Sequence, residues 1–276
     1  QAAARVGANA NTNRARNVIL VVGDGMGITT LTAARIFAGQ NQGLSGEDYS
    51  LSFEQLPYSA LVKTWNTDMQ TPDSAGTMSA LITGAKTRAG VLSVDSSVTR
   101  KDCNSGKGHE LTSLFELAEH SGKATGVVTT TRITHATPAA TYAHSVDRDW
   151  EADSQMPASA RASGCVDIAS QLLQWPAGDG LEVAFGGGSA MFLPKEQGGD
   201  RSDGRNLMQE WQQRAGHHSL TDADQLRAAD LGSGHWLGLF AASHLPWVDD
   251  RNDNTPGLQE MTARALERLQ QNPQGY

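Results

Sequence analysis

The chain has 276 residues, enough for one large domain or two smaller ones with a substantial core. Hydrophobic residues make up 38% and charged residues 19%, a globular rather than a disordered composition. The 30 acidic residues exceed the 22 basic ones and give a net charge of −8, which argues against a nucleic-acid partner because DNA and RNA need a basic face. Any phosphate site must therefore carry local positive charge from arginine or metal.

The predicted elements alternate between strand and helix along the chain. This alternation predicts an α/β fold of three layers, with a mostly parallel central sheet covered by helices on both faces. Ligands of such folds bind at the carboxyl ends of the strands. The expected strands are 17–22, 60–65, 124–130, 181–185 and 236–241, and the expected helices are 28–39, 74–83, 110–121, 158–173, 206–216, 221–230 and 255–269.

The two ends of the sequence lead to further expectations. Residues 1–16 are polar and predict a loose arm, as in an exported protein whose signal peptide has been removed. No apolar run reaches the roughly 18 residues of a membrane span. No linker divides the chain, so a single domain over 1–276 is expected. The last helix is followed by NPQGY where a buried strand is due, so we expect this domain to be C-terminally incomplete at Tyr276.

The segment TPDSAG at 71–76 places Asp73 and Ser74 at the start of a predicted helix, directly after Pro72. Aspartate and serine are favoured helix caps, and Gly84 suits the helix end, so a purely structural interpretation is available. The functional interpretation makes Ser74 a nucleophile at a helix N-terminus, where free N–H groups favour a phosphate. The local sequence leaves both open.

The turn GDGMG at 23–27 follows the first predicted strand and contains Asp24. A dinucleotide-binding loop is one alternative, but the glycine spacing differs and a carboxylate would repel a pyrophosphate. Asp24 is better suited to bind a metal ion through oxygen. A plain turn aspartate is the structural alternative.

The segment THATPAATYAHSVDRDW at 134–150 contains His135 and Thr137 around a turn, and Arg148 between Asp147 and Asp149. A guanidinium group binds phosphate oxygens in bidentate fashion, and a nearby carboxylate can hold it in place. A solvated ion pair with the flanking aspartates is the alternative for Arg148. His135 could equally be a structural histidine.

Together, NVILVVGDGMG, TPDSAGTMSALITGAKT and THATPAATYAHSVDRDW resemble the signature motifs of the alkaline phosphatases, and the similarity continues to the end of the chain. The animal-type branch is the most similar, because it also has histidine at the position of His135. The resemblance implies a phosphomonoesterase of broad substrate range that uses two Zn²⁺ and one Mg²⁺. It implies that Ser74 is the nucleophile and that Arg148 binds the phosphate, oriented by Asp73.

For the metals, the resemblance implies that Asp24 bridges the second zinc and the magnesium. Ser74 also contacts the second zinc, Thr137 ligates magnesium, and His135 tunes the magnesium site through water. The family's remaining ligands lie beyond the matching residues. We therefore expect this chain alone not to complete the three-metal site. A catalytically inactive phosphate-binding fragment is the alternative, while a sulfatase or phosphodiesterase lacks support from DSAGT.

Two cysteines, Cys103 and Cys165, lie in polar stretches, and the residues alone leave free thiols and a disulfide open. They match a disulfide of the animal branch, so the resemblance implies the bridge and an oxidising compartment. By the same resemblance we expect a homodimer that is periplasmic or secreted. Its partners would be phosphate monoesters and inorganic phosphate, with no nucleic acid and no membrane span.

Overall fold

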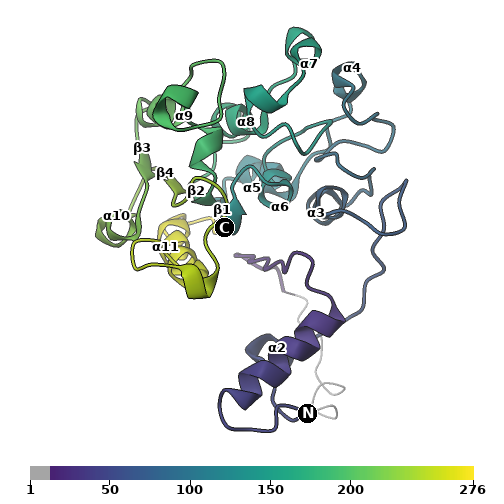
Figure 1. Ribbon diagram of the computed structural model, residues 1–276, viewed down its shortest axis with the longest axis vertical. Helices are drawn as coiled ribbons and strands as arrows, with labels where there is room; N and C mark the ends of the chain where they lie inside the picture. The colour runs from purple at the N-terminus through teal and green to yellow at the C-terminus, as the bar shows by residue number, and fades with distance from the viewer. Residues whose placement is uncertain (1–12) are drawn as a thin grey trace. The chain divides into compact units, whose positions relative to one another are not determined.

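The computed structural model describes residues 13–276, so most of the expected arm at 1–16 lies outside the described residues. The chain divides into two compact units, Gln1–Lys63 and Thr64–Tyr276, each described here by itself. The first unit contains α2 (Ile28–Gln40), purple in Figure 1, and a short 3-10 helix η1 (Ser52–Gln55). The helix expected at 28–39 is thus confirmed, while a single domain over 1–276 stays a prediction.

The strand expected at residues 17–22 is wrong. In the described part of the chain these residues form no ladder, and Val18 and Val21 are 60% and 84% exposed. The strand expected at 60–65 is likewise not formed, and Leu61 is 88% exposed. An apolar run becomes a strand only where a neighbour supplies backbone hydrogen-bond partners, and the sequence of the run does not encode that neighbour.

The sheet of the second unit has four parallel strands in the order β1-β2-β4-β3. Three expected strands are confirmed as β1 (Gly126–Arg132), β2 (Val183–Gly187) and β4 (His235–Leu239). The strand β3 (His217–Leu220) was not expected, because HHSL has neither an apolar run nor an apolar alternation. Its pairing with β4 therefore depends on tertiary contacts.

The helices of the second unit follow the expected order, with corrections to their bounds. The helix expected at 110–121 begins at Leu114, where Ser113 caps it, and the helix expected at 206–216 ends at Gln212. The helix expected at 158–173 is two helices, because Gly164 has φ +86° and Asp167 caps a new helix. The last helix is capped by Gly257, two residues after the expected cap. The helices are α3 (Ser74–Thr83), α4 (Cys103–Gly106), α5 (Leu114–His120), α6 (Ala136–Ala139), α7 (Ala158–Ala162), α8 (Ile168–Gln174), α9 (Leu207–Gln212), α10 (Ala223–Ala228) and α11 (Leu258–Leu269), with 3-10 helices η2 (Asp153–Gln155), η3 (Ser189–Met191), η4 (Lys195–Gln197) and η5 (Val248–Asp250).

Both faces of the sheet are buried, which confirms the three-layer α/β architecture. Side chains on β2 alternate, so that Ala184 joins a core with residues of α3, α6, α8 and α9, whereas Val183 and Phe185 join a core with residues of α10 and α11. Figure 1 shows α11 on one side of the strands and α5, α6 and α8 on the other. Among the described residues, no helix is long and apolar enough to cross a bilayer.

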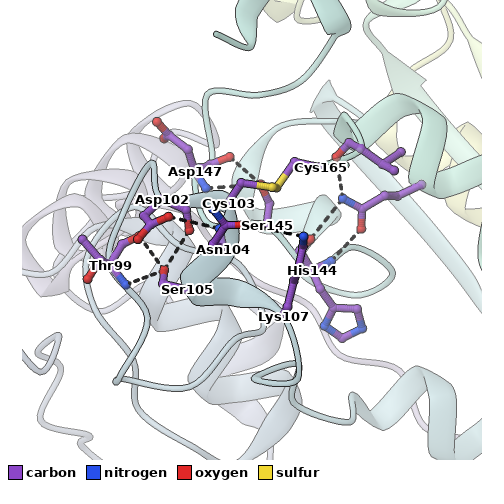
Figure 2. The surroundings of a disulfide bond; sticks show 12 residues. Thr99, Asp102, Cys103, Asn104, Ser105, Lys107, His144, Ser145, Asp147 and Cys165 are labelled. Carbon is purple, nitrogen blue, oxygen red and sulfur yellow. Dashed lines mark hydrogen bonds between the residues drawn. A yellow bond between two sulfur atoms is a disulfide. The ribbon is translucent and has the colours of Figure 1, made fainter. Parts of the chain in front are cut away.

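The disulfide implied by the resemblance is present between Cys103 and Cys165, with an S–S distance of 2.16 Å (Figure 2). It joins α4 to the loop that follows α7. On the α4 side, Asp102 caps the helix by accepting from the N–H of Asn104 at 3.0 Å. The bridge closes a loop across a sequence separation of 62 residues, which spans β1 and α6.

Candidate active site

Helix α3 begins at Ser74 because Asp73 caps it. Asp73 has extended backbone angles, φ −96° and ψ 165°, and its Oδ1 accepts from the N–H of Gly76 at 3.1 Å. The helix ends at Gly84, which has φ +78°. The structural interpretation of this segment is therefore confirmed. Capping uses only one carboxylate oxygen of Asp73, so the other remains available for a second role.

That second oxygen, Oδ2 of Asp73, faces the candidate phosphate ligand. It accepts from Nη1 of Arg148 at 3.1 Å and from the N–H of Gly90 at 2.9 Å. Oδ1 accepts a further bond from Nδ2 of Asn66 at 2.7 Å. Burial raises the pKa of Asp73, but the bonds from Gly76, Asn66 and Arg148 together outweigh burial and hold that pKa below its usual value. Asp73 is thus a fixed anion that orients Arg148.

Arg148 connects the aspartate, the serine and the histidine expected from sequence. Its Nη1 lies 3.0 Å from Oγ of Ser74, and its Nη2 lies 3.1 Å from Nε2 of His135. Its side chain is 19% exposed, so solvent still reaches the guanidinium. The alternative of a solvated ion pair with the flanking aspartates is not what the structure shows, because Asp73 is the acid that Arg148 pairs with among the described residues.

The contact between Arg148 and His135 defines the histidine tautomer. A guanidinium can only donate, so Nε2 of His135 accepts and Nδ1 carries the ring proton. Burial, followed by the positive charge of Arg148, lowers the pKa of His135, which also favours the neutral ring. Among the described residues, the buried Nδ1 atom has no hydrogen-bond partner. This atom therefore fits a polar group that residues 13–276 do not provide.

His135 and Thr137 lie at the carboxyl end of β1, as the parallel-sheet argument predicts. His135 is the N-cap residue of α6, and Thr137 lies within that helix. Asp24 lies in the first unit, in a turn that precedes α2 and in which Gly25 has φ +65°. The structure thus brings Asp73, Ser74, Arg148 and His135 together. The approach of Asp24 and the ligand role of Thr137 stay predictions.

The donors present fit part of a metal centre. Hydroxyl oxygens such as those of Ser74 and Thr137 suit magnesium, which binds oxygen ligands. The imidazole of His135 does not fit direct ligation, because Nε2 accepts from Arg148 and Nδ1 carries the proton. The unpartnered Nδ1 of His135 also fits a water or hydroxide held by a nearby metal. However, the described residues contain no cluster of three or more His, Cys, Asp or Glu side chains that could hold a metal ion.

Sequence reasoning missed two residues that support Asp73. These are Asn66 and Gly90, which donate to opposite oxygens of the carboxylate. Gly76 is constrained for a related reason, because a Cβ there would lie 2.7 Å from Oδ1 of Asn66. Glycine and asparagine are common in turns and loops, so these residues carried no signal of this function.

Comparisons with known proteins agree with this site. The family model described as alkaline phosphatase matches residues 15–276. The alkaline phosphatase of Gadus morhua is 42% identical over 282 residues, which cover 96% of this chain and 59% of that protein. The tissue-nonspecific isozyme of Gallus gallus is 44% identical over 283 residues, covering 96% of this chain and 54% of that protein. The chain therefore spans little more than half the length of these relatives.

The fold leads to the same group of proteins. The crystal structure of Thermus thermophilus alkaline phosphatase is similar with a TM-score of 0.75 at 29% identity, covering 96% of this chain and 49% of that one. Family and fold comparisons thus agree over nearly the whole chain, and the family match includes every residue of the site described above. This chain belongs to the alkaline phosphatase family.

Proposed function

We propose that the protein hydrolyses phosphate monoesters of broad structure through a phosphoserine intermediate on Ser74. The observation that carries the proposal is the guanidinium of Arg148, whose Nη1 is 3.1 Å from Oδ2 of Asp73 and 3.0 Å from Oγ of Ser74. A cation fixed beside a hydroxyl at the start of a helix suits a tetrahedral dianion. Family membership makes phosphomonoester hydrolysis the reaction that fits this geometry.

The proposed reaction has two steps, in which Ser74 and Arg148 have different roles. Oγ of Ser74 attacks phosphorus as the bond to the ester oxygen breaks, and the serine proton passes to the departing oxygen, which leaves as the alcohol. Water then attacks the phosphoserine, releases inorganic phosphate and restores Ser74. Arg148 and the free N–H groups of α3 compensate negative charge on the phosphate oxygens during both steps. Because the contacts are to the phosphate, they leave the alcohol portion unconstrained.

The family is metal-dependent, and a solved variant of the alkaline phosphatase from the Antarctic bacterium TAB5 contains magnesium in its M3 site. We propose that Asp24, Ser74, Thr137 and His135 belong to a centre of two zinc ions and one magnesium ion. When bound, such ions lower the pKa of coordinated hydroxyl groups and compensate negative charge. His135 would act through its Nδ1 donor, since its Nε2 is bonded to Arg148.

The disulfide and the relatives support an exported protein. The Cys103–Cys165 bridge fits an oxidising compartment, so we propose a periplasmic or secreted location. A homodimer is proposed from the family alone. Sedimentation of the metal-loaded protein over a range of concentrations tests the dimer, and a monomer at every concentration would reject it.

The test of function compares three substrates on the metal-loaded protein: p-nitrophenyl phosphate, bis(p-nitrophenyl) phosphate and p-nitrophenyl sulfate. We expect preferential turnover of the monoester, loss of turnover on chelation, and a phosphoserine trapped by acid quench and located at Ser74 by mass spectrometry. Ser74→Ala should lower turnover at least about a thousandfold, because the hydroxyl is the nucleophile. Ser159→Ala, at an exposed serine of α7, is the matched control and should leave turnover unchanged.

Preference for the diester or the sulfate would contradict the proposal. Phosphate binding without turnover and without phosphoserine would instead identify an inactive phosphate-binding module, the alternative that remains.

A further inference from the structure

The two aspartates that flank Arg148 are bound by a different arginine. Nε and Nη2 of Arg100 lie 3.0 and 2.7 Å from Oδ1 of Asp147, and Nη2 lies 2.8 Å from Oδ2 of Asp149. Among the described residues, no hydrogen bond or ion pair joins Arg148 to either flanking aspartate. Asp147 and Asp149 are therefore bound by Arg100, and the guanidinium of Arg148 between them in sequence is left for other partners.

Arg100 also packs against Gly90, whose backbone bonds both Asp73 and Arg148. A Cβ on Gly90 would lie 2.5 Å from Cζ of Arg100, so the guanidinium is directly against the glycine backbone. Gly90 donates its N–H to Oδ2 of Asp73 at 2.9 Å, and its carbonyl accepts from the N–H of Arg148 at 2.8 Å. One glycine therefore bonds both charged partners of the site, and its φ of +76° suits glycine in particular.

The charges in this arrangement determine which cation the two aspartates bind. Without Arg100, the carboxylates of Asp147 and Asp149 would need another cation, and Arg148 lies between them in sequence. The side chain of Asp147 is fully buried, and its nearest other cation is Nζ of Lys101, 3.8 Å from Oδ2. A carboxylate bound to Arg148 would compete with phosphate for the same N–H donors, because both are bidentate oxygen acceptors.

We propose that Arg100 is a positioning residue for the phosphate site: by binding Asp147 and Asp149 it keeps the guanidinium of Arg148 directed at Ser74. This inference rests on the proposed function for its catalytic consequence. Its physical content, phosphate affinity that depends on Arg100, can be measured without turnover. Arg100 makes its hydrogen bonds to the two aspartates, and among the described residues none joins it to Ser74.

The decisive variants separate positioning from support of the fold. Arg100→Gln removes the charge, and Arg100→Gln with Asp149→Asn also removes a competing acid whose side chain is 66% exposed. Arg205→Gln is the matched control, because Arg205 is 36% exposed and its hydrogen bonds go to Glu210 and Ser170, which lie outside the site. Inorganic phosphate is the probe, and its binding is measured as the phosphate-induced rise in melting temperature of each variant.

We expect Arg100→Gln to weaken phosphate binding and raise KM for p-nitrophenyl phosphate about tenfold, with kcat changed about twofold or less. The added Asp149→Asn should restore most of the lost affinity, which a merely structural role would not allow. Arg205→Gln should leave affinity and KM at the unsubstituted level.

Equal affinities in Arg100→Gln and Arg205→Gln would overturn the inference, as would a double variant no better than Arg100→Gln. Failure of the proposed function gives a different pattern: the unsubstituted protein would show no turnover, while the affinity series could still rise and fall as expected. Failure of the inference would leave turnover and phosphoserine intact with a flat affinity series.

Discussion

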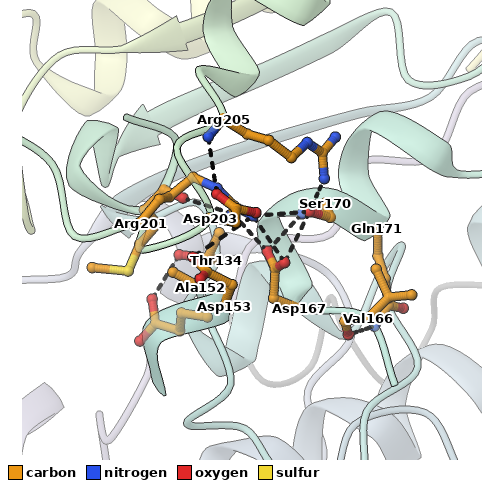
Figure 3. Close-up of polar contacts among 12 residues, drawn as sticks. Thr134, Ala152, Asp153, Val166, Asp167, Ser170, Gln171, Arg201, Asp203 and Arg205 are labelled. Atoms are coloured by element: carbon orange, nitrogen blue, oxygen red, sulfur yellow. Dashed lines mark hydrogen bonds and ion pairs between the residues drawn. The ribbon is translucent and has the colours of Figure 1, made fainter. Parts of the chain in front are cut away.

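Two arginine–aspartate clusters in the same unit have opposite arrangements. Arg201 is fully buried, and its guanidinium binds Asp167 at 2.9 and 3.2 Å, Asp203 at 3.1 Å through Nε, and Oγ of Ser170 at 3.4 Å (Figure 3). Arg148 has one carboxylate partner and is partly exposed. The number of acids around the guanidinium, rather than the pairing itself, distinguishes an arginine that stabilises the fold from one with capacity left for a ligand.

The sharpest test of this comparison is to truncate each arginine. Arg201→Ala leaves Asp167 and Asp203 without their buried counter-charge and should cost about 3–5 kcal/mol of unfolding free energy, because an uncompensated buried charge is expensive. Arg148→Ala should change stability far less but abolish most phosphate affinity. Urea unfolding and the phosphate-induced shift in melting temperature measure the two quantities.

Arg227→Ala serves as the control for both, because Arg227 is an exposed arginine paired with Asp224 and Glu260. It should alter neither quantity measurably. The comparison breaks if Arg148→Ala unfolds the protein as strongly as Arg201→Ala, or if Arg201→Ala remains fully stable.

Much of the fold follows from local sequence rules. Capping chemistry encodes both ends of α3: the cap is Asp73, one of the two candidates that the sequence offered, and the helix ends at Gly84 as predicted. Strands depend on partners far away in sequence. Residues 17–22 have the composition of a strand without a ladder in the described chain, whereas β3 has a ladder without the composition.

The residues of the site show the same difference between local sequence motifs and long-range contacts. Asp73, Ser74 and Arg148 belong to motifs and were identified from sequence. Arg100 was not, because its bond to Asp147 joins residues 47 positions apart and nothing in either segment indicates the other. Long-range pairing of charges, like strand pairing, is a tertiary property that a single sequence leaves open.

The disulfide links the segment that contains Arg100 to the segment that contains Asp167 of the Arg201 cluster, and it offers a second test. Cys103 follows Arg100 by three residues, and Cys165 precedes Asp167 by two. Removing the bridge with Cys103→Ser and Cys165→Ser should lower the unfolding free energy by about 2–4 kcal/mol, by releasing the closed loop in the unfolded chain.

Removal of the disulfide should loosen the α4 side more than the α8 side. On one side, α8 contributes Ile168 and Leu172 to the core and Arg201 holds its capping residue Asp167, whereas α4 is a single turn with an exposed Asn104. We expect faster hydrogen exchange in residues 99–109 than in 167–174 after bridge removal. Equal acceleration in both segments would show that the Arg201 cluster does not hold its side independently.

The smallest expected effect concerns two buried carboxylates that form no ion pair with an arginine. Burial, together with the nearby negative charge of Glu182, raises the pKa of Glu119 to about 8, although Thr125 donates to its Oε1 at 2.5 Å. Burial likewise raises the pKa of Glu182 to about 7. Within the described residues, neither carboxylate forms an ion pair of 4.0 Å or less with a basic side chain. Both groups therefore favour the protonated state in the folded protein at pH values below about 7.

The sign of the pH dependence follows from linkage. A raised folded pKa means that the native state binds more protons than the unfolded chain, so stability falls as pH rises from about 4.5 to about 8. Glu119→Gln mimics the protonated acid and should remove part of this loss, raising the melting temperature at about pH 9 but not at about pH 5.

Glu151→Gln is the contrasting variant, because Arg132 binds Glu151 through Nε at 2.8 Å and Nη2 at 2.6 Å and opposes the effect of burial on its pKa. It should destabilise at both pH values, since it removes an acid that an arginine needs. If Glu119→Gln destabilised equally at both, Glu119 would be ionised in the folded protein, and the distinction between carboxylates with and without an arginine would fail.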